Sequence, residues 1–228
     1  MITTRARSAA LAAVCVAAFA AGCSSSGSDS GGDADGAAAP DAPTEIEGVQ
    51  NFYGEYGSYQ AVQDAIADGE VTAEDLEYPQ VVQQEHVDGE AGWDGNPPVY
   101  ELAPPVAGNH LSVWQTCNGS VYDGPITDGN AVHSMEHGAV WLTYDPELVD
   151  EAQIAALAAK IEGRDYSLMS PYPGQGVAVS LQSWGNQYQT DDPADPNIDA
   201  YLDTYILNEA FNPEAMATCS GGNSALAE

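Results

Sequence analysis

The residues of this chain that are best suited to chemistry are histidines, and three of its four histidines lie in a single stretch. His133 and His137 flank the segment Ser-Met-Glu, and His110 precedes them. Neutral imidazole is a common ligand of zinc and of copper. We therefore take His110, His133 and His137 as candidate ligands of a transition metal. Taken one at a time, each histidine also fits an ordinary hydrogen-bonded side chain.

The backbone conformation of residues 133–137 decides which chemistry the segment supports. On a helix, His133 and His137 share one face, as in the HxxEH metallopeptidase signature, in which Glu136 would be the general base. On a strand, Met135 lies between the two histidines on one face, and Glu136 points to the other. A thioether among imidazoles would favour Cu(I).

Glycine-rich flanks argue for the extended conformation. Residues 128–130 (Asp-Gly-Asn) precede the segment closely, and Gly138 follows it directly, before an apolar run that is typical of a buried strand. We therefore predict that residues 133–137 are not helical and that the chain is not a metallopeptidase. Glu136 is left as a weak catalytic candidate and, with Met135, as a candidate for contacts around the metal.

The N-terminal residues have the features of a lipoprotein secretion signal. Arg5 and Arg7 precede a short apolar run that ends in Ala-Ala-Gly and Cys23. The run is shorter than the roughly 20 residues of a membrane-spanning helix. We predict a signal peptide over residues 1–22, a lipid anchor on Cys23 and a location on the outer face of the cell membrane. Residues 23–45 lack large apolar side chains and predict a disordered linker, followed by one globular domain over residues 46–228.

The charge of the chain is strongly negative, with 35 acidic residues against 4 basic ones and a formal net charge of −31. Such a chain is repelled by nucleic acid and by anionic lipid, so we exclude both as partners apart from the lipid anchor itself. The acids are dispersed, as on a solvated surface, and they would also concentrate cations such as a metal ion near the protein. The sequence indicates no particular protein partner.

Two cysteines are left once Cys15 has been removed with the signal and Cys23 is lipidated, namely Cys117 and Cys219. In an exported chain an even number of cysteines usually indicates a disulfide bond. The alternative is a thiolate ligand to metal at Cys117.

The patterns of secondary structure predict an α+β fold, a single domain with a small mixed sheet flanked by two or three helices. Helical patterns cover residues 59–68, begin again at Asp145-Pro146 and stop at Gly163, and return after Asp195-Pro196. Strand patterns cover residues 80–87, 139–144, 166–169 and 177–182. A thioredoxin-like α/β fold is the alternative, although the chain has no redox CxxC motif.

A series of short motifs follows the domain from its first histidine to its last cysteine. In order they are His86-Val-Asp-Gly89, Pro104 to Trp114, Cys117 to Tyr122, Val132 to Gly138, Ser170 to Gly174, Trp184-Gly185 and Cys219. Over about residues 80–222 the chain resembles the bacterial exported proteins grouped as domain of unknown function 3105.

The resemblance implies three things about the candidate site. All four histidines fall on motif positions, which adds His86 to the possible ligands. Met135 takes a position where the family often has leucine, which implies packing instead of ligation. Cys117 and Cys219 coincide with a family cysteine pair, which implies a disulfide.

Our leading functional hypothesis is a lipid-anchored extracytoplasmic domain that binds copper or zinc through His110, His133 and His137, with His86 as a fourth candidate and with Glu136 either as a ligand or as a residue that contacts the ligands. It favours a binding protein over an enzyme. The second hypothesis is a metal-dependent hydrolase or oxidase that uses the same histidines. The third is a structural or envelope-interaction module whose histidines only form hydrogen bonds.

Overall fold

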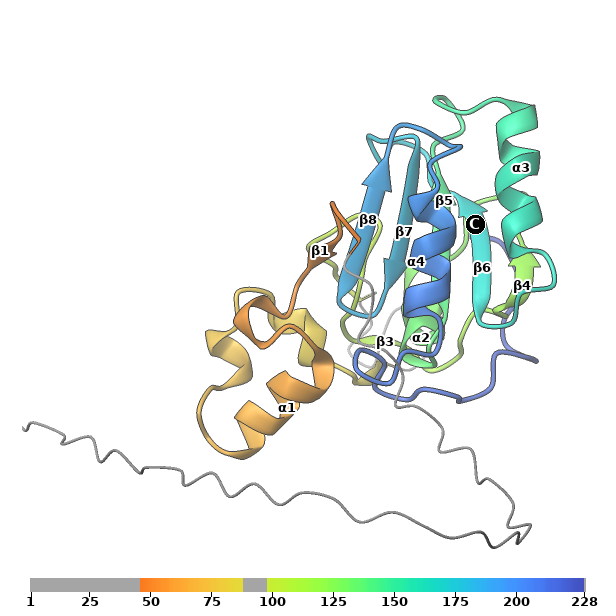
Figure 1. Cartoon of the computed structure of the whole chain (residues 1–228). Coiled ribbons are helices and arrows are strands. Elements are labelled where there is room, and N and C mark those ends of the chain that lie inside the picture. Colours follow the sequence, from red (N-terminus) through yellow and green to blue (C-terminus); the bar gives the residue numbers. More distant parts are fainter. Residues whose placement is uncertain (1–45, 88–97, 228) are drawn as a thin grey trace, which may run out of the picture. The chain divides into compact units, whose positions relative to one another are not determined.

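The computed structural model describes residues 46–87 and 98–227 (Figure 1). The predicted signal peptide, Cys23 and the linker lie outside the described residues. Within the described ranges, no helix combines the length and the apolar character needed to cross a membrane.

The described residues form eight strands and four α-helices (Figure 1). The strands are β1 (Gln50–Asn51), β2 (His86–Val87), β3 (His110–Leu111), β4 (Asn118–Val121), β5 (Val140–Tyr144), β6 (Ser167–Pro171), β7 (Val179–Ser183) and β8 (Asn186–Thr190). The α-helices are α1 (Tyr59–Ala67), α2 (Asp128–Glu136), α3 (Glu151–Ile161) and α4 (Asn197–Tyr205). Three 3-10 turns cover Gly54–Tyr56, Ala73–Asp75 and Pro79–Val82.

The strands form a six-stranded mixed sheet and a separate two-stranded sheet. The order in the large sheet is β1-β8-β7-β5-β6-β4, in which β5 and β4 run parallel to β6 and the other neighbours are antiparallel. The small sheet pairs β2 with β3 in parallel. This arrangement confirms the predicted α+β class with a mixed sheet.

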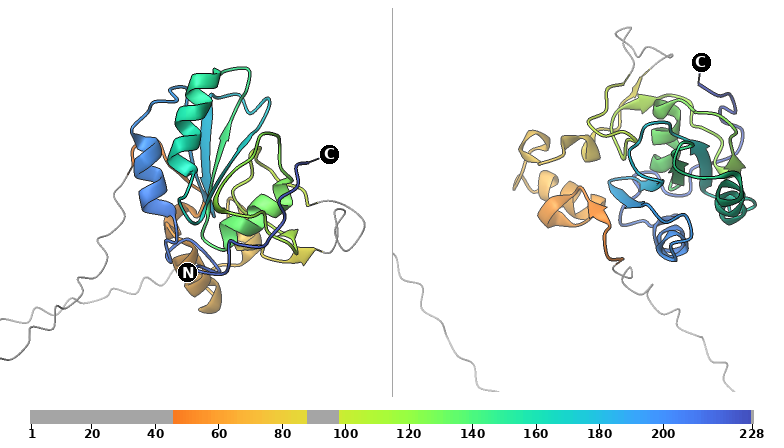
Figure 2. Two further views of the ribbon diagram at one scale, coloured as in Figure 1. Left: turned by 90° about the vertical axis from the view of Figure 1, so that its right-hand side faces the viewer. Right: turned by 90° about the horizontal axis from the view of Figure 1, so that it is seen from above.

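Three helices pack on the large sheet from two sides. Helices α3 and α4 cover one face, and α2 lies on the opposite face (Figures 1 and 2). Every residue of β5 is buried, as expected for a central strand that is covered on both faces. The large sheet is therefore the scaffold that holds α2 in place.

The start of α3 differs from the prediction. Asp145 does not cap a helix at Pro146, because residues 146–148 form only a turn, in which the N–H of Leu148 donates to Asp145 O at 3.0 Å. The Asp145 carboxylate accepts the backbone N–H groups of Glu147 and Gly174, each at 3.0 Å. The cap is Asp150, whose side chain accepts the N–H of Gln153 at 2.9 Å while the Gln153 side chain accepts the N–H of Asp150 at 2.8 Å. This reciprocal capping box fixes the helix start five residues later.

The predicted strand over residues 80–87 is also largely wrong. Pro79–Val82 forms a 3-10 turn, and only His86–Val87 is a strand. Proline at the first position of the turn is compatible with helical φ values. Val81 is fully buried in the core, and this burial holds the turn against the rest of the domain.

The most consequential difference is that residues 128–136 are α-helical, whereas we predicted an extended segment. Gly138, which we counted against a helix, is part of its C-terminal cap: it has φ +102°, and its N–H donates to Met135 O at 3.0 Å. The N–H of Ala139 donates to Ser134 O at 3.0 Å, which completes a Schellman motif. A glycine in the left-handed region directly after the last turn is a stop signal for a helix.

Candidate metal centre

The small sheet brings the first two histidines together. In the parallel pair of β2 and β3, His86 is the register partner of His110. Their ring centroids are 4.8 Å apart. The two histidines are far apart in the sequence, so the spacing of the motifs gives no direct indication that their side chains meet.

Helix α2 adds a third histidine because it packs closely against β3. A Cβ on Gly129 would lie 2.7 Å from Leu111 Cγ, so glycine is what permits the helix to approach this strand. One turn further along, His133 Nδ1 lies 2.7 Å from the backbone oxygen of Leu111. The ring of His133 is then 4.6 Å from that of His86 and 4.8 Å from that of His110, centroid to centroid.

Four side chains direct one potential ligand atom each toward a common point. They belong to His86, His110, His133 and Glu136, and these atoms all lie within 4.8 Å of one another. Ligand atoms that bind one zinc ion at 2.0–2.1 Å are about 3 to 4 Å apart, so small side-chain rotations would bring all four into contact with an ion. Three of the four residues are nearly inaccessible to solvent, and only the His86 side chain, 44 % exposed, opens the cluster to solvent.

Backbone carbonyls determine which ring nitrogen is available. His110 Nδ1 lies 2.9 Å from Gly108 O, as His133 Nδ1 faces Leu111 O. Because a carbonyl oxygen only accepts hydrogen bonds, Nδ1 must carry the proton in both rings. Nε2 of each neutral ring therefore keeps a free lone pair, and this arrangement is the usual one for a histidine that binds metal.

The contact between Glu136 and His110 is the feature that most strongly favours a bound cation. Glu136 Oε2 lies 2.9 Å from His110 Nε2 and 3.4 Å from His86 Nε2. Despite the short distance, His110 Nε2 makes no hydrogen bond of good geometry to a described residue. Nε2 of the neutral ring and the carboxylate oxygen are both acceptors, so their close approach in a buried site is costly unless a cation, either a proton or a metal ion, lies between them.

Electrostatics keep His133 and Glu136 in the protonation states that a metal requires. Burial and the neighbouring histidines together lower the pKa of His133 to about 4, although its bond to Leu111 O opposes the shift. Burial raises the pKa of Glu136, but its interactions with His110 and His133 outweigh this effect and leave the pKa below its usual range. At neutral pH His133 is therefore an uncharged imidazole and Glu136 a carboxylate.

The structure leaves two sequence candidates outside this set of four. The His137 ring is 4.6 Å from that of His133, and its Nδ1 lies 2.9 Å from Thr218 O, but its ligand atoms are not among the four that converge. Met135 is fully buried in the hydrophobic core. Because residues two apart on a helix point in nearly opposite directions, Met135 does not share the face of His133.

The four converging groups offer three imidazole nitrogens and one carboxylate oxygen. Donors of this kind suit zinc, copper(II) and related divalent ions, whereas Cu(I) selection depends on thiolate or thioether ligands. The two cysteines cannot serve, since Cys117 and Cys219 are joined in a disulfide across 102 residues of sequence. The extended arrangement with a thioether ligand is therefore replaced by a three-histidine, one-glutamate cluster.

Comparison with known families places these residues in context. The family model described as Protein of unknown function (DUF3105) matches residues 94–221, more than half of the chain. The chain belongs to the DUF3105 family. No curated protein and no solved structure matches it.

The match of the DUF3105 model covers three of the four converging residues, His110, His133 and Glu136. It also covers both disulfide cysteines, whereas His86 precedes the matched range. In this DUF3105 domain the HxxEH segment does form a helix, but its geometry differs from the peptidase arrangement. Glu136 converges with His133 in the cluster, whereas a peptidase would use both histidines as ligands and keep the glutamate as base.

The sequence of this DUF3105 domain left open whether Glu136 is a ligand or only contacts the ligands, and the structure places it among the four converging residues. The missed signal is the spacing of three between His133 and Glu136, which places both side chains on one face as soon as the segment is helical.

A further feature, which the sequence did not suggest, is Trp114. Its ring centroid lies 5.8 Å from that of His133 and 5.2 Å from that of His137, and its buried Nε1 has no hydrogen-bond partner among the described residues.

Proposed function

We propose that this protein binds one divalent transition-metal ion, zinc or copper(II), through His86, His110, His133 and Glu136. The observation that supports this proposal is the convergence of four potential ligand atoms within 4.8 Å of one another, with His110 Nε2 only 2.9 Å from Glu136 Oε2 in a buried site. A bound metal ion would take both of these acceptor atoms as ligands. The carbonyl-bound Nδ1 atoms of His110 and His133 preorganise the remaining ligands.

Metal content tests the proposal in a pair of matched variants. His133→Asn keeps an amide N–H that can reach Leu111 O in place of Nδ1 but removes Nε2. His137→Asn makes the same change one turn later, where Nδ1 faces Thr218 O. We expect zinc affinity to fall by about 10- to 100-fold or more in His133→Asn and by less than about threefold in His137→Asn.

The measurement uses protein purified without a nickel column, stripped of metal and titrated with zinc or copper(II) by calorimetry. Far-UV circular dichroism establishes that both variants are folded. Equal affinity in His133→Asn and the unchanged protein would contradict the proposal, as would substoichiometric metal in all three.

We also propose that the domain, over residues 46–228, is held on the outer face of the cell membrane by a lipid on Cys23. The disulfide between Cys117 and Cys219 supports an oxidising compartment outside the cytoplasm. In a bacterial host, the full chain should partition into the detergent phase of Triton X-114, and Cys23→Ala should stay in the aqueous phase. Aqueous partitioning of both would contradict the anchor.

A further inference from the structure

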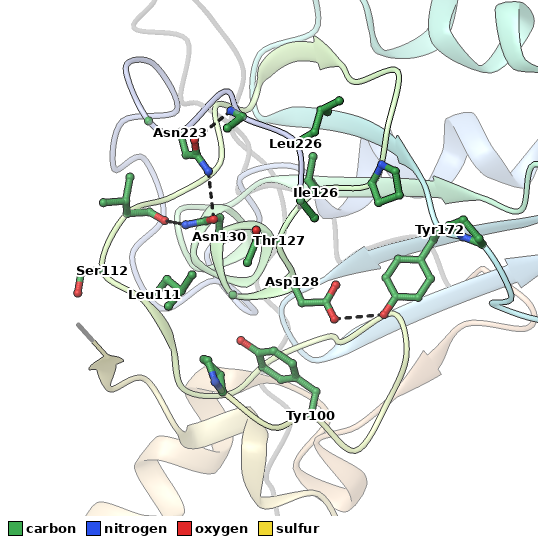
Figure 3. A pocket seen from close by; sticks show the side chains of 18 of the residues that line it. Tyr100, Leu111, Ser112, Ile126, Thr127, Asp128, Asn130, Tyr172, Asn223 and Leu226 are labelled. Carbon is green, nitrogen blue, oxygen red and sulfur yellow. Dashed lines mark hydrogen bonds between the residues drawn. The ribbon is translucent and has the colours of Figure 1, made fainter. Parts of the chain in front are cut away.

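A second concave site lies at the opposite end of helix α2. It is a cavity of about 990 Å³ bordered by the first turn of α2, by the β3 residue Leu111 and by the segment around Tyr172 (Figure 3). Successive strand residues point to opposite faces, so Leu111 faces this cavity while His110 faces the metal centre. The cavity is therefore separate from the metal ligands although it shares two elements with them.

The walls of the cavity are largely apolar and aromatic. Leu111, Ile126 and Leu226 contribute aliphatic surface, and Tyr100 and Tyr172 contribute rings (Figure 3). A volume near 1,000 Å³ with walls of this kind is in the range of sites that enclose small organic molecules.

One charged side chain, Asp128, stands out among the described residues that line the cavity. Its Oδ2 accepts a hydrogen bond from the Tyr172 hydroxyl at 3.2 Å. No lysine or arginine contributes to the lining. The two basic residues of the described domain, Lys160 and Arg164, pair with Asp199 and Asp203 of α4. Among the described residues, the Asp128 carboxylate is thus left without a lysine or arginine partner.

The surroundings of Asp128 favour a positively charged ligand group. Figure 3 shows its carboxylate between the side chains of Tyr100 and Tyr172, and its negative charge also acts on the hydroxyl of Tyr100. Aromatic rings beside a carboxylate attract organic cations through the charge and the ring quadrupole together. Burial raises the pKa of Asp128 to about 6, although the bond from Tyr172 opposes the shift, so the ionised form is held at a cost that a bound cation would offset.

We propose that this cavity binds a small organic amine, with its ammonium group on Asp128 between Tyr100 and Tyr172 and its apolar body against the aliphatic walls. The net charge of −31 attracts cations toward the whole molecule, which agrees with a positively charged ligand.

The test compares three probes of similar shape at pH 7.5 by calorimetry: phenethylamine, 2-phenylethanol and 3-phenylpropionate. A charge-assisted hydrogen bond contributes roughly 1.5–3 kcal/mol, so we expect phenethylamine to bind at least about tenfold more tightly than the alcohol. The propionate should show no binding. Equal affinity of the unchanged protein for the amine and the alcohol, or no binding of the amine, would overturn the proposal.

Two substitutions locate the site. Asp128→Asn retains an acceptor for Tyr172 and should weaken phenethylamine at least about tenfold. Asp123→Asn removes an exposed acid from outside the cavity and should leave the affinity unchanged. An equal loss in both variants would indicate a general charge effect and would contradict a defined site.

A third variant separates the cavity from the metal centre, because amines can also bind metal ions. Phenethylamine should bind His133→Asn as tightly as it binds the unchanged protein. Loss of amine binding in His133→Asn would assign the amine to the metal centre and would overturn the proposal. Failure of the metal proposal itself would leave the result for the amine unaltered.

Discussion

The pairing of Glu136 with His110 is the residue-scale feature on which the metal proposal depends. The two side chains come from different elements, and both are almost completely buried. Each presents an acceptor to the other when His110 is neutral with its proton on Nδ1. Such an arrangement lowers the stability of the metal-free protein and raises its affinity for a cation, so stability and function should respond in opposite directions to one substitution.

Glu136→Gln tests this opposition. The glutamine amide can donate a hydrogen bond to His110 Nε2, so the metal-free variant should be more stable by about 1 kcal/mol. Its affinity for zinc should fall at least about tenfold, because a carboxylate ligand is lost. Urea denaturation with and without zinc measures both quantities. A variant that is destabilised without metal, or that retains full affinity, would contradict the assigned role.

His133 predicts a pH dependence of the metal-free protein. Its pKa is lowered to about 4 in the folded state, against about 6.5 in the unfolded chain, so the unfolded state binds more protons between these values. The contribution of the neutral ring is present above pH 6.5 and is lost as the pH falls toward 4.

Urea denaturation at several pH values measures this contribution. Between pH 6.5 and 4.5, the free energy of unfolding should fall by roughly 1 to 2 kcal/mol more in the unchanged protein than in His133→Asn. The comparison of the two proteins removes the common effect of carboxylate protonation. Parallel pH profiles would show that His133 is not held neutral by the fold.

At the scale of elements, the contact between α2 and β3 sets the geometry of both sites. Gly129 permits the contact, and the first turn that contains it borders the cavity while the last turn bears His133 and Glu136, two of the proposed metal ligands. A substitution at this contact should therefore weaken the affinity of the proposed metal centre for zinc even though no ligand residue is altered.

Gly129→Ala is the corresponding experiment. The added Cβ would approach Leu111 Cγ to 2.7 Å and push α2 away from β3, at a cost of about 1–3 kcal/mol in stability and with a weaker affinity for zinc. Leu111→Ala in the same chain should restore part of both losses, because the shorter side chain makes room. A double-mutant cycle measures this recovery, and strict additivity would contradict the proposed contact.

The sequence predicted the elements whose apolar patterns are regular. The predicted helix over residues 59–68 corresponds to α1, and the run over 139–144 corresponds to β5. Helix α2 was missed because it is buried on almost every side, so it has no single apolar stripe, and its polar residues face the metal cluster and neighbouring backbone. The same burial that hides the helix from pattern recognition is what creates the site.

The positions of the proposed ligands in space could not be predicted from the sequence, for a different reason. The pairing of His86 with His110 depends on the register of two short strands, and two residues carry too little pattern to fix a register. His137 was predicted as a ligand from its spacing, and the helix end at Gly138 instead directs it toward Thr218.

At the scale of the whole molecule, the disulfide joins Cys117, at the entry to β4, to Cys219 in the C-terminal segment. That segment contacts the end of α2, since the N–H groups of Glu214 and Met216 donate to the backbone oxygens of Glu136 and His137. The disulfide therefore holds the last turn of α2 in place, and it also constrains the unfolded chain.

Replacement of both cysteines, Cys117→Ser with Cys219→Ser, should lower the free energy of unfolding by about 4.7 kcal/mol, the chain-entropy value for a loop of this length. Zinc stoichiometry per folded molecule should remain that of the unchanged protein, because neither cysteine is a ligand. Loss of zinc from a variant that is still folded would instead assign a ligand role to sulfur.

The most direct test of the proposed three-histidine, one-glutamate centre is X-ray absorption spectroscopy of the zinc-loaded protein. We expect a first shell of nitrogen and oxygen at about 2.0–2.1 Å, with the multiple-scattering signature of imidazole, and no sulfur near 2.3 Å. Glu136→Gln should retain the imidazole signature with a changed oxygen contribution. A sulfur shell, or a shell of oxygen atoms without imidazole scattering, would contradict the proposed centre.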